Sequence, residues 1–172
     1  MVSNLSILVY GNQALRKRAK PVTGVTPALK QLADDMLDSM YESNGIGLAA
    51  PQVGESVRLI VVDVSGGEGG EKQPQVLFNP EIISAMGEAI AEEGCLSVPG
   101  VWADVTRPEI ITLRAMDREG KVFEKKGLDG ILARCIQHEI NHLEGVLFVD
   151  KISTTDRILN HAKLKKMASQ AK

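Results

Sequence analysis

The segment QHEINH, residues 137–142, constrains this chain more than any other part of its sequence. It lies in a stretch from Leu128 to about Leu143 whose apolar residues recur at helical spacing around most of the circumference, which predicts a helix buried on most sides. On that helix His138 and His142 are about 40° apart around the axis and about 6 Å apart along it, so both can bind one metal ion. Burying two histidines and a glutamate costs free energy unless they have a partner or a task.

Glu139 follows the first histidine directly and lies about 60° from His142 around the helix, beside an ion rather than on it. This position suits a general base acting on metal-bound water, and the spacing H-E-x-x-H is typical of metal-dependent hydrolases. The alternative is a core helix whose two histidines have their hydrogen-bonding groups paired and bind no metal.

A catalytic metal site requires a third protein ligand and an open position. Two familiar arrangements are excluded, because Phe148 occupies the place of a third histidine in H-E-x-x-H-x-x-G-x-x-H and Glu144 is the last glutamate in the chain. The remaining candidates are Cys95, Cys135, His161, Asp150 and Asp156.

Two of these candidates are weak. Cys135 is about 10 Å along the helix axis from His142, too far for both to join His138 on one ion, and is interpreted as a small buried residue beside the site. His161, on a basic terminal segment, is interpreted as solvated. Cys95 lies in the turn-rich segment EEGCLSVPG, which can bring a thiolate to the helix, although a lone buried thiol explains it equally well.

The rest of the chain predicts an α+β fold. Thr26 is an N-cap before Pro27, and the helix that follows runs to about Glu42. The segments 57–64, 75–83 and 109–117 are strand candidates, and DREG at 117–120 predicts a hairpin with KVFEKK. From Thr155 to Lys172 we expect a basic surface helix. We therefore predict antiparallel sheets packed around a buried central helix that carries the HExxH motif, with a C-terminal surface helix.

Length and charge exclude several classes of protein. A chain of 172 residues can bury one substantial core, so we predict a single catalytic domain over residues 1–172. The net charge is −2 and aromatic residues make up 3%, which argues against sequence-specific nucleic-acid binding. We find no membrane span, and two cysteines cannot form a disulfide framework, so we expect a cytoplasmic protein.

The segment GIGLAAPQVG, residues 45–54, formally contains the dinucleotide-binding pattern G-x-G-x-x-A. Its context is wrong, because it follows a helix and Pro51 would interrupt the helix that should begin there. We interpret it as a loop in which Gly45 and Gly47 allow backbone to approach a ligand and Gln52 offers its side-chain amide. The alternative is a simple connection from helix to strand.

The three segments GIGLAAPQVG, EGCLS and QHEINH, in this order, resemble the three motifs of the peptide deformylase family. The likeness extends over nearly the whole chain and includes FNP at 78–80. It implies a bacterial or organellar hydrolase that removes the formyl group from the initiating methionine of newly made polypeptides. The family usually uses Fe²⁺, which Ni²⁺, Co²⁺ or Zn²⁺ can replace.

The resemblance also implies roles for individual residues. Metal-bound hydroxide attacks the formyl carbon, and Glu139 takes up the proton and delivers it to the leaving amine. Gln52 and the backbone N–H of Leu96 stabilise the oxyanion, and Gly47 keeps the entrance open. The metal ligands are Cys95, His138 and His142.

We expect the substrate to lie against the glycine loop. Ile46, next to Gly45, should form an apolar slot for the methionine side chain together with the helix face that carries Ile131 and Cys135. Arg107 is expected to meet the substrate backbone or a carboxylate near the mouth, or else to be solvated.

Three rival functions remain open, and the resemblance adds the ribosome as a candidate binding partner. A general metallopeptidase would share the helix but use a histidine or acidic third ligand. A cysteine hydrolase would use Cys95 as nucleophile and His138 as base, and a structural zinc domain would need a fourth ligand. By the resemblance, the basic tail at 161–172 is a candidate ribosome contact.

Overall fold

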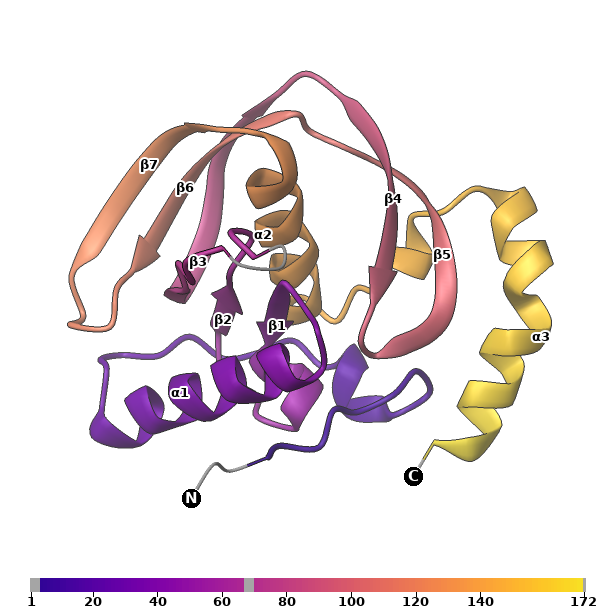
Figure 1. The fold of residues 1–172 in the computed structure, drawn as a ribbon, viewed down its shortest axis with the longest axis horizontal. Helices are drawn as coiled ribbons and strands as arrows, with labels where there is room; N and C mark the ends of the chain where they lie inside the picture. Colours follow the sequence, from indigo (N-terminus) through magenta and orange to yellow (C-terminus); the bar gives the residue numbers. More distant parts are fainter. Residues whose placement is uncertain (1–3, 67–69, 172) are drawn as a thin grey trace.

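The computed structural model describes residues 4–66 and 70–171, and within them three α-helices and seven strands form a mixed α+β fold (Figure 1). The helices are α1 (Pro27–Glu42), α2 (Gly130–Leu143) and α3 (Thr154–Gln170), with short 3₁₀ turns η1 (Gln13–Arg16), η2 (Ala50–Val53) and η3 (Phe148–Asp150). The strands are β1 (Gly47–Ala49), β2 (Leu59–Val62), β3 (Gln75–Met86), β4 (Ala89–Cys95), β5 (Val98–Arg107), β6 (Ile110–Met116) and β7 (Val122–Leu128).

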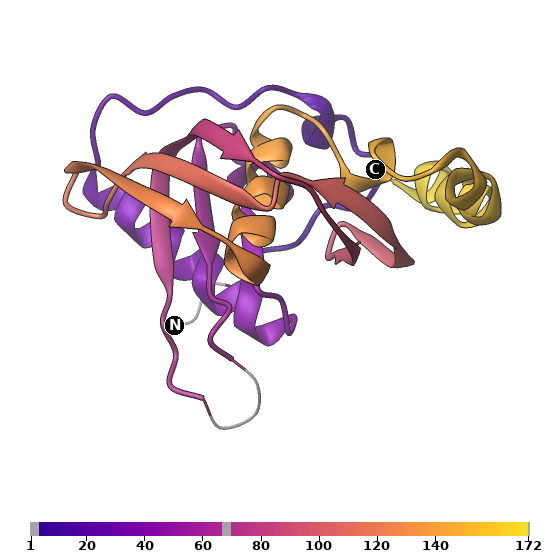
Figure 2. The ribbon, with the colours of Figure 1, turned by 90° about the horizontal axis from the view of Figure 1, so that it is seen from above.

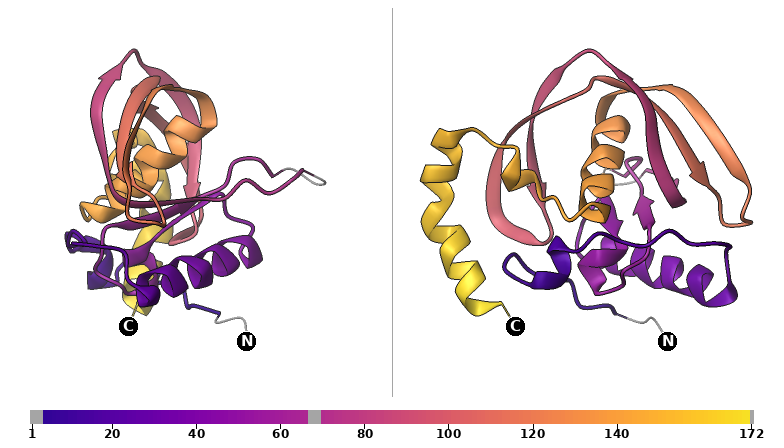
Figure 3. Two further views of the ribbon diagram at one scale, coloured as in Figure 1. Left: turned by 90° about the vertical axis from the view of Figure 1, so that its left-hand side faces the viewer. Right: turned by 180° about the vertical axis from the view of Figure 1, so that it is seen from behind.

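The larger sheet has the strand order β1-β2-β3-β6-β7, and each neighbouring pair is antiparallel. Along β2, Ile60 and Val62 join the core that includes residues of α2, whereas Leu59 and Val61 join the core that includes residues of α1. A strand buried on both faces must be apolar throughout, which explains the run LIVV. Figures 1 and 3 show α1 and α2 on opposite sides of β1 and β2.

The smaller sheet is the antiparallel hairpin β4–β5. Residues of β5 on its inner face, with Leu15 and Phe148, form a third core to which α3 contributes Leu164. Leu164 is the one buried residue of α3, and Figure 2 shows this helix standing apart from the sheets, which confirms the predicted C-terminal surface helix. In the part of the chain that is described, no helix has both the length and the apolarity to cross a membrane.

Local signals in the sequence locate several elements correctly. Thr26 caps α1 by accepting a hydrogen bond from the Leu29 backbone N–H, with Pro27 in the first turn. The turn at 117–120 joins β6 to β7 as predicted. The start of the second helix was placed too early: Leu128 ends β7 and α2 begins at Gly130, and the positive φ of Gly127 and Gly130 marks the change of backbone direction at this junction.

Two segments interpreted as loops contain regular structure. The region around Cys95 was expected to be turn-rich, but Cys95 is the last residue of β4 and pairs with Val98 at the start of β5. The register shifts between Glu93 and Cys95, where two steps along β4 face five steps along β5, from Val98 to Ala103, so the extra residues of this irregularity lie in β5. The glycine segment likewise includes β1 and η2, because its backbone pairs with β2.

Candidate metal centre

Helix α2 brings His138, Glu139 and His142 together in the protein interior, where all three side chains are buried. The helix packs on the larger sheet through Ala133, Ile136 and Ile140, which leaves the polar face turned toward β1 and β4. The ring of Phe148 stacks on His138 with 6.0 Å between the ring centres. The phenylalanine side chain has no atom that can ligate a metal, so Phe148 contributes only its packing against one of the two histidines.

Cys95 reaches the histidines from the end of β4. The ligand atoms of Cys95, His138 and His142 all lie within 4.8 Å of one another, and Cys95 Sγ is 3.3 Å from His142 Nε2. In a tetrahedral zinc site with ordinary bond lengths, a sulfur and a nitrogen ligand are about 3.6 Å apart. Within residues 4–66 and 70–171 this is the one group of three such side chains close enough to hold an ion, and its soft sulfur and two imidazoles suit a divalent transition metal.

The other third-ligand candidates lie elsewhere. Asp150 accepts hydrogen bonds from Arg16, and Asp156 accepts one from Ser153 at the start of α3. His161 is exposed on α3. Cys135 is buried and its Sγ lies 3.5 Å from the carbonyl oxygen of Ile46.

Glu93, which sequence reasoning missed, orients His138. Its Oε1 lies 2.8 Å from His138 Nδ1, so an N–H at Nδ1 leaves the Nε2 lone pair for a metal. Glu93 is two residues before Cys95, and recognising β4 as a strand would have placed both side chains on one face. The carboxylate also accepts hydrogen bonds from Arg107 and Arg134.

Arg107 does not lie where it was expected. The solvated alternative is wrong, since Arg107 is 4% exposed, and the carboxylate that it meets is the buried Glu93 rather than a group at the mouth. Its guanidinium donates to Glu93 at 2.6 and 2.9 Å and to the Asn141 side chain at 2.7 Å. Alternation along β5 explains this, because Ala103, Val105 and Arg107 share the inward face of the strand.

The charges around Glu93 have a measurable consequence. Burial acts to raise the pKa of Glu93, but hydrogen bonds from Arg107 and His138 outweigh it and hold the pKa at about 2. A carboxyl group whose pKa is lower in the folded than in the unfolded protein stabilises the fold at pH values above its unfolded-state pKa. This stabilisation is lost as the pH falls through the folded-state pKa.

We therefore expect the free energy of unfolding of the metal-free protein to fall by about 3 kcal/mol between about pH 4.5 and about pH 2 because of Glu93. Urea unfolding monitored by circular dichroism across this range measures it. In Glu93→Gln this part of the pH dependence should disappear, whereas Glu81→Gln, which removes an exposed carboxylate, should retain it. A Glu93→Gln protein with the wild-type acid profile would contradict the assignment.

Glu139 and Gly47 are in close approach. A Cβ added to Gly47 would lie 2.6 Å from Glu139 Oε1 and 2.7 Å from Cys135 Sγ, so glycine is required there. Glu139 Oε2 and His142 Nδ1 are buried without a partner among the described residues. Burial raises the pKa of Glu139 to about 7 and lowers that of His142 well below its usual value, which keeps His142 neutral as a ligand must be. A buried carboxylate oxygen without a protein partner is suited to a water molecule at the centre.

Gln52 and Leu96 border the same space. Gln52 is buried, and its Oε1 accepts a hydrogen bond from the Ala49 N–H at 2.8 Å, which fixes the orientation of the amide. Its Nε2 donates to Ser97 Oγ and lies 3.6 Å from Cys95 Sγ. Leu96 follows Cys95 in the chain, so two potential donors flank the thiolate.

The glycine segment also meets Leu96 and the helix. A Cβ on Gly45 would lie 2.8 Å from Leu96 Cδ1, so Gly45 packs closely on that side chain. Ile46 is 40% exposed and contacts Cys135 through its carbonyl, and Ile131, 59% exposed, lies one turn before Cys135 on α2. These apolar residues border the centre on the side of the glycine segment.

Comparison with known proteins gives a consistent family. Residues 4–158 match the family model described as polypeptide deformylase. A protein named peptide deformylase from Alkalilimnicola ehrlichii is 49% identical over 98% of this chain and 93% of its own length. The solved structure of a peptide deformylase from Legionella pneumophila is 46% identical in sequence and covers 98% of this chain and 97% of its own, with a TM-score of 0.87. That of a plant peptide deformylase is 37% identical and covers 99% of this chain and 92% of its own, with a TM-score of 0.92.

Proposed function

This chain belongs to the polypeptide deformylase family, whose members act on N-formylmethionyl peptides, and we propose that residues 1–172 form one catalytic domain that hydrolyses the formyl amide at the centre just described. One observation carries this proposal: Cys95, His138 and His142 converge beside Glu139, a buried carboxylate with one oxygen that lacks a partner in the described residues. The reaction consumes one water and releases formate and a free amino group.

The three clustered side chains would hold one divalent metal ion, with His138 oriented through Glu93. When bound, the ion supplies Lewis acidity and lowers the pKa of a water in its open position. As the family resemblance implies, we propose Fe²⁺ as the native ion, with Zn²⁺, Ni²⁺ or Co²⁺ as possible replacements. A thiolate ligand supports this set, since soft sulfur suits transition metals better than Mg²⁺ or Ca²⁺.

Glu139 moves the proton. We assign Oε2 as the acceptor of the proton from the attacking water, because this oxygen has no protein partner in the described part of the chain. The same carboxyl then donates that proton to the amine nitrogen as the bond from formyl carbon to nitrogen breaks. A pKa of about 7 in the metal-free protein, which burial causes, supports both roles near neutral pH.

Gln52 and Leu96 stabilise the developing charge on the formyl oxygen. The Gln52 amide cannot rotate without losing its hydrogen bond with the Ala49 N–H, so Nε2 is a preorganised donor. The Leu96 backbone N–H is the second donor in this proposal. Removing a single preorganised donor of this kind costs about 10²- to 10³-fold in kcat in other hydrolases.

The peptide substrate is proposed to bind between two strand edges. Where the structure describes them, β1 pairs only with β2 and β4 pairs only with β5, so each strand keeps an unpaired edge. An extended peptide can pair with such edges through its own backbone. The methionine side chain would then enter the apolar border formed by Ile46, Ile131 and Cys135.

The cellular setting follows from the substrate. Newly made formylated polypeptides occur where bacterial proteins are synthesised, so we propose that the enzyme acts in the cytoplasm. Contact between the basic helix α3 and the ribosome stays a prediction, which co-sedimentation of a chain truncated at Asn160 would test.

Selectivity for the formyl group tests the proposed function. We expect formyl-Met-Ala to be hydrolysed, with formyl-Asp-Ala a poor substrate because of its charge. Acetyl-Met-Ala should react at least about 10-fold more slowly, because its methyl group must fit where Gln52 and Leu96 converge on one oxygen. Separation of the products by liquid chromatography measures all three. Comparable rates on the acetyl compound, or release of free alanine, would favour a general metallopeptidase.

A further inference from the structure

The three clustered side chains come from two parts of the molecule that share no apolar core. His138 and His142 lie on α2, whose buried apolar residues belong to the core of the larger sheet. Cys95 lies on the hairpin β4–β5, which packs on the core that includes Phe148. Among the described residues, none of β4 or β5 is in the first core, none of α2 is in the second, and neither strand pairs with the larger sheet. The link that sets the distance between Cys95 and the histidines is therefore to be sought in polar contacts.

Arg134 connects α2 to both strands of the hairpin. Its guanidinium donates hydrogen bonds to the Glu93 carboxylate at 2.7 Å and to the backbone carbonyl of Val105 on β5 at 2.9 Å. A third hydrogen bond, at 2.7 Å, goes to the carbonyl of Ala89, the first residue of β4. The Arg134 side chain is 14% exposed, so these contacts form largely out of water. A planar guanidinium is suited to this role, because its donors point in fixed directions.

Arg134 lies on the side of α2 that carries the metal ligands. It precedes His138 by four residues, as His138 precedes His142, and residues four apart share one side of a helix. Glu93 accepts the hydrogen bond from Arg134 through Oε2 and contacts His138 Nδ1 through Oε1. Cys95 follows Glu93 by two residues on the same strand. The guanidinium therefore holds the strand that ends in Cys95 against the helix that carries both histidines.

Arg107 also contacts Glu93, but it cannot make the same connection. It belongs to β5, so its two hydrogen bonds to Glu93 join one strand of the hairpin to the other, and it reaches α2 only through the Asn141 side chain. The sequence of α2 contains no other arginine and no lysine. Removing Arg134 would still leave Glu93 with Arg107 and His138 as partners, so the buried carboxylate would not lose its compensating charge.

We propose that Arg134 is a positioning residue of the metal centre, which holds β4 against α2 so that Cys95, His138 and His142 can bind one ion together. Arg134 is not one of the ligands, and it acts through Glu93 and the backbone of the hairpin. This inference rests on the proposed function, because it takes the three clustered side chains as the metal ligands. Without Arg134 the two histidines remain on one helix, whereas the thiolate is no longer held at the same distance from them.

Binding of Co²⁺ tests the proposal, because a thiolate bound to this ion gives a sulfur-to-metal charge-transfer absorption that reports the Cys95 bond. Arg134→Met keeps much of the side-chain length and removes the charge and the donors. We expect its dissociation constant for Co²⁺, measured anaerobically by competition with a chromogenic chelator, to rise about 10- to 100-fold, as for other residues that orient metal ligands. The charge-transfer band at saturating Co²⁺ should be weaker than in the wild type or shifted from it.

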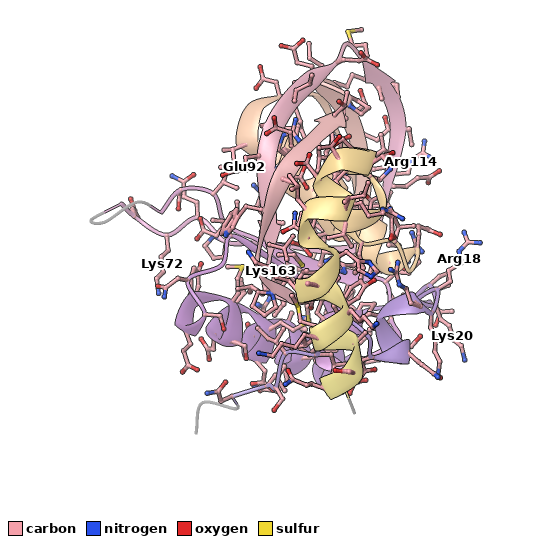
Figure 4. All side chains as sticks on the ribbon, turned by 90° about the vertical axis from the view of Figure 1, so that its right-hand side faces the viewer. Arg18, Lys20, Lys72, Glu92, Arg114 and Lys163 are labelled. Atoms are coloured by element: carbon pink, nitrogen blue, oxygen red, sulfur yellow. The ribbon has the colours of Figure 1, made fainter. Side chains whose placement is uncertain are left out.

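Arg114→Met is the matched control. Arg114 pairs with Glu124 on the larger sheet and lies at the surface of the molecule, where Figure 4 shows it. This variant should keep the wild-type affinity and absorption. If Arg134→Met does not fold, Arg134→Lys makes the comparison, since lysine retains the charge but lacks the planar fork, and its dissociation constant should rise about 3- to 10-fold.

Thermal unfolding of the metal-free proteins separates positioning from a general effect on stability. An Arg134 variant with a lower unfolding temperature, but with the Co²⁺ affinity and absorption of the wild type, would overturn the proposal. A wild type whose Co²⁺ complex lacks the charge-transfer band, or a Cys95→Ser protein that retains it, would instead reject the ligand set on which the proposed function depends. Failure of the wild type to hydrolyse formyl-Met-Ala would reject the proposed function itself.

Discussion

Glu139→Gln will bind metal as the wild type does and will hydrolyse formyl-Met-Ala about 10²- to 10⁴-fold more slowly, the range expected when general acid–base catalysis is lost. The substitution keeps the size of the side chain, and Glu139 is not among the three clustered ligands. What it removes is a basic oxygen. An amide cannot accept the water proton at Oε2 and return it to the amine.

Two measurements check this result: kcat under anaerobic conditions and metal content by elemental analysis. Glu124→Gln is a matched control, because Glu124 is a carboxylate on β7 whose partner is the exposed Arg114. A Glu139→Gln enzyme with near wild-type turnover would show that another group moves the proton. Loss of metal from this variant would mean that Glu139 helps to hold the ion.

Cys95→Ser will lose stoichiometric metal, and its activity will fall with it. A neutral hydroxyl is a far weaker ligand than a thiolate, and two histidines remain at a site that needs three protein ligands. Losing partners outside the ligand shell already costs about 10- to 100-fold in metal affinity, so we expect a loss of more than about 100-fold here. Elemental analysis of anaerobically purified protein measures the metal content directly.

Cys135→Ser provides the comparison, since it makes the same change at the other cysteine. Cys135 contacts the Ile46 carbonyl rather than the clustered histidines, so this variant should retain its metal. Full metal content in Cys95→Ser would refute the ligand assignment. A wild-type enzyme that stays active after chelation would instead favour the cysteine hydrolase with Cys95 as nucleophile.

Local patterns were enough to predict part of this protein. The N-cap Thr26, Pro27 and the helix to Glu42 were predicted from neighbouring residues, as was the hairpin turn at 117–120. The juxtaposition of His138 and His142 was predictable because a helix converts a spacing of four residues into a shared face. Such features depend on backbone geometry over a few residues, which a single segment carries within itself.

The hairpin β4–β5 shows where local reasoning ended. Its sequence has glycine and proline near the turn and charged residues on the exposed face, which imitates a loop. Its strand character comes from pairing between β4 and β5 and from packing on Leu15 and Phe148, which are distant in sequence. Among the five candidates for the third ligand, spacing therefore excluded only Cys135, and the family motif favoured Cys95.

The tertiary structure alone decided which side chains surround the centre. Glu93 meets His138 across 45 residues of chain, and Arg107 joins them from the inward face of β5 instead of facing solvent. A helix sets the angle between its own residues, but contacts between distant segments depend on how sheets and helices pack, which no short window of sequence contains.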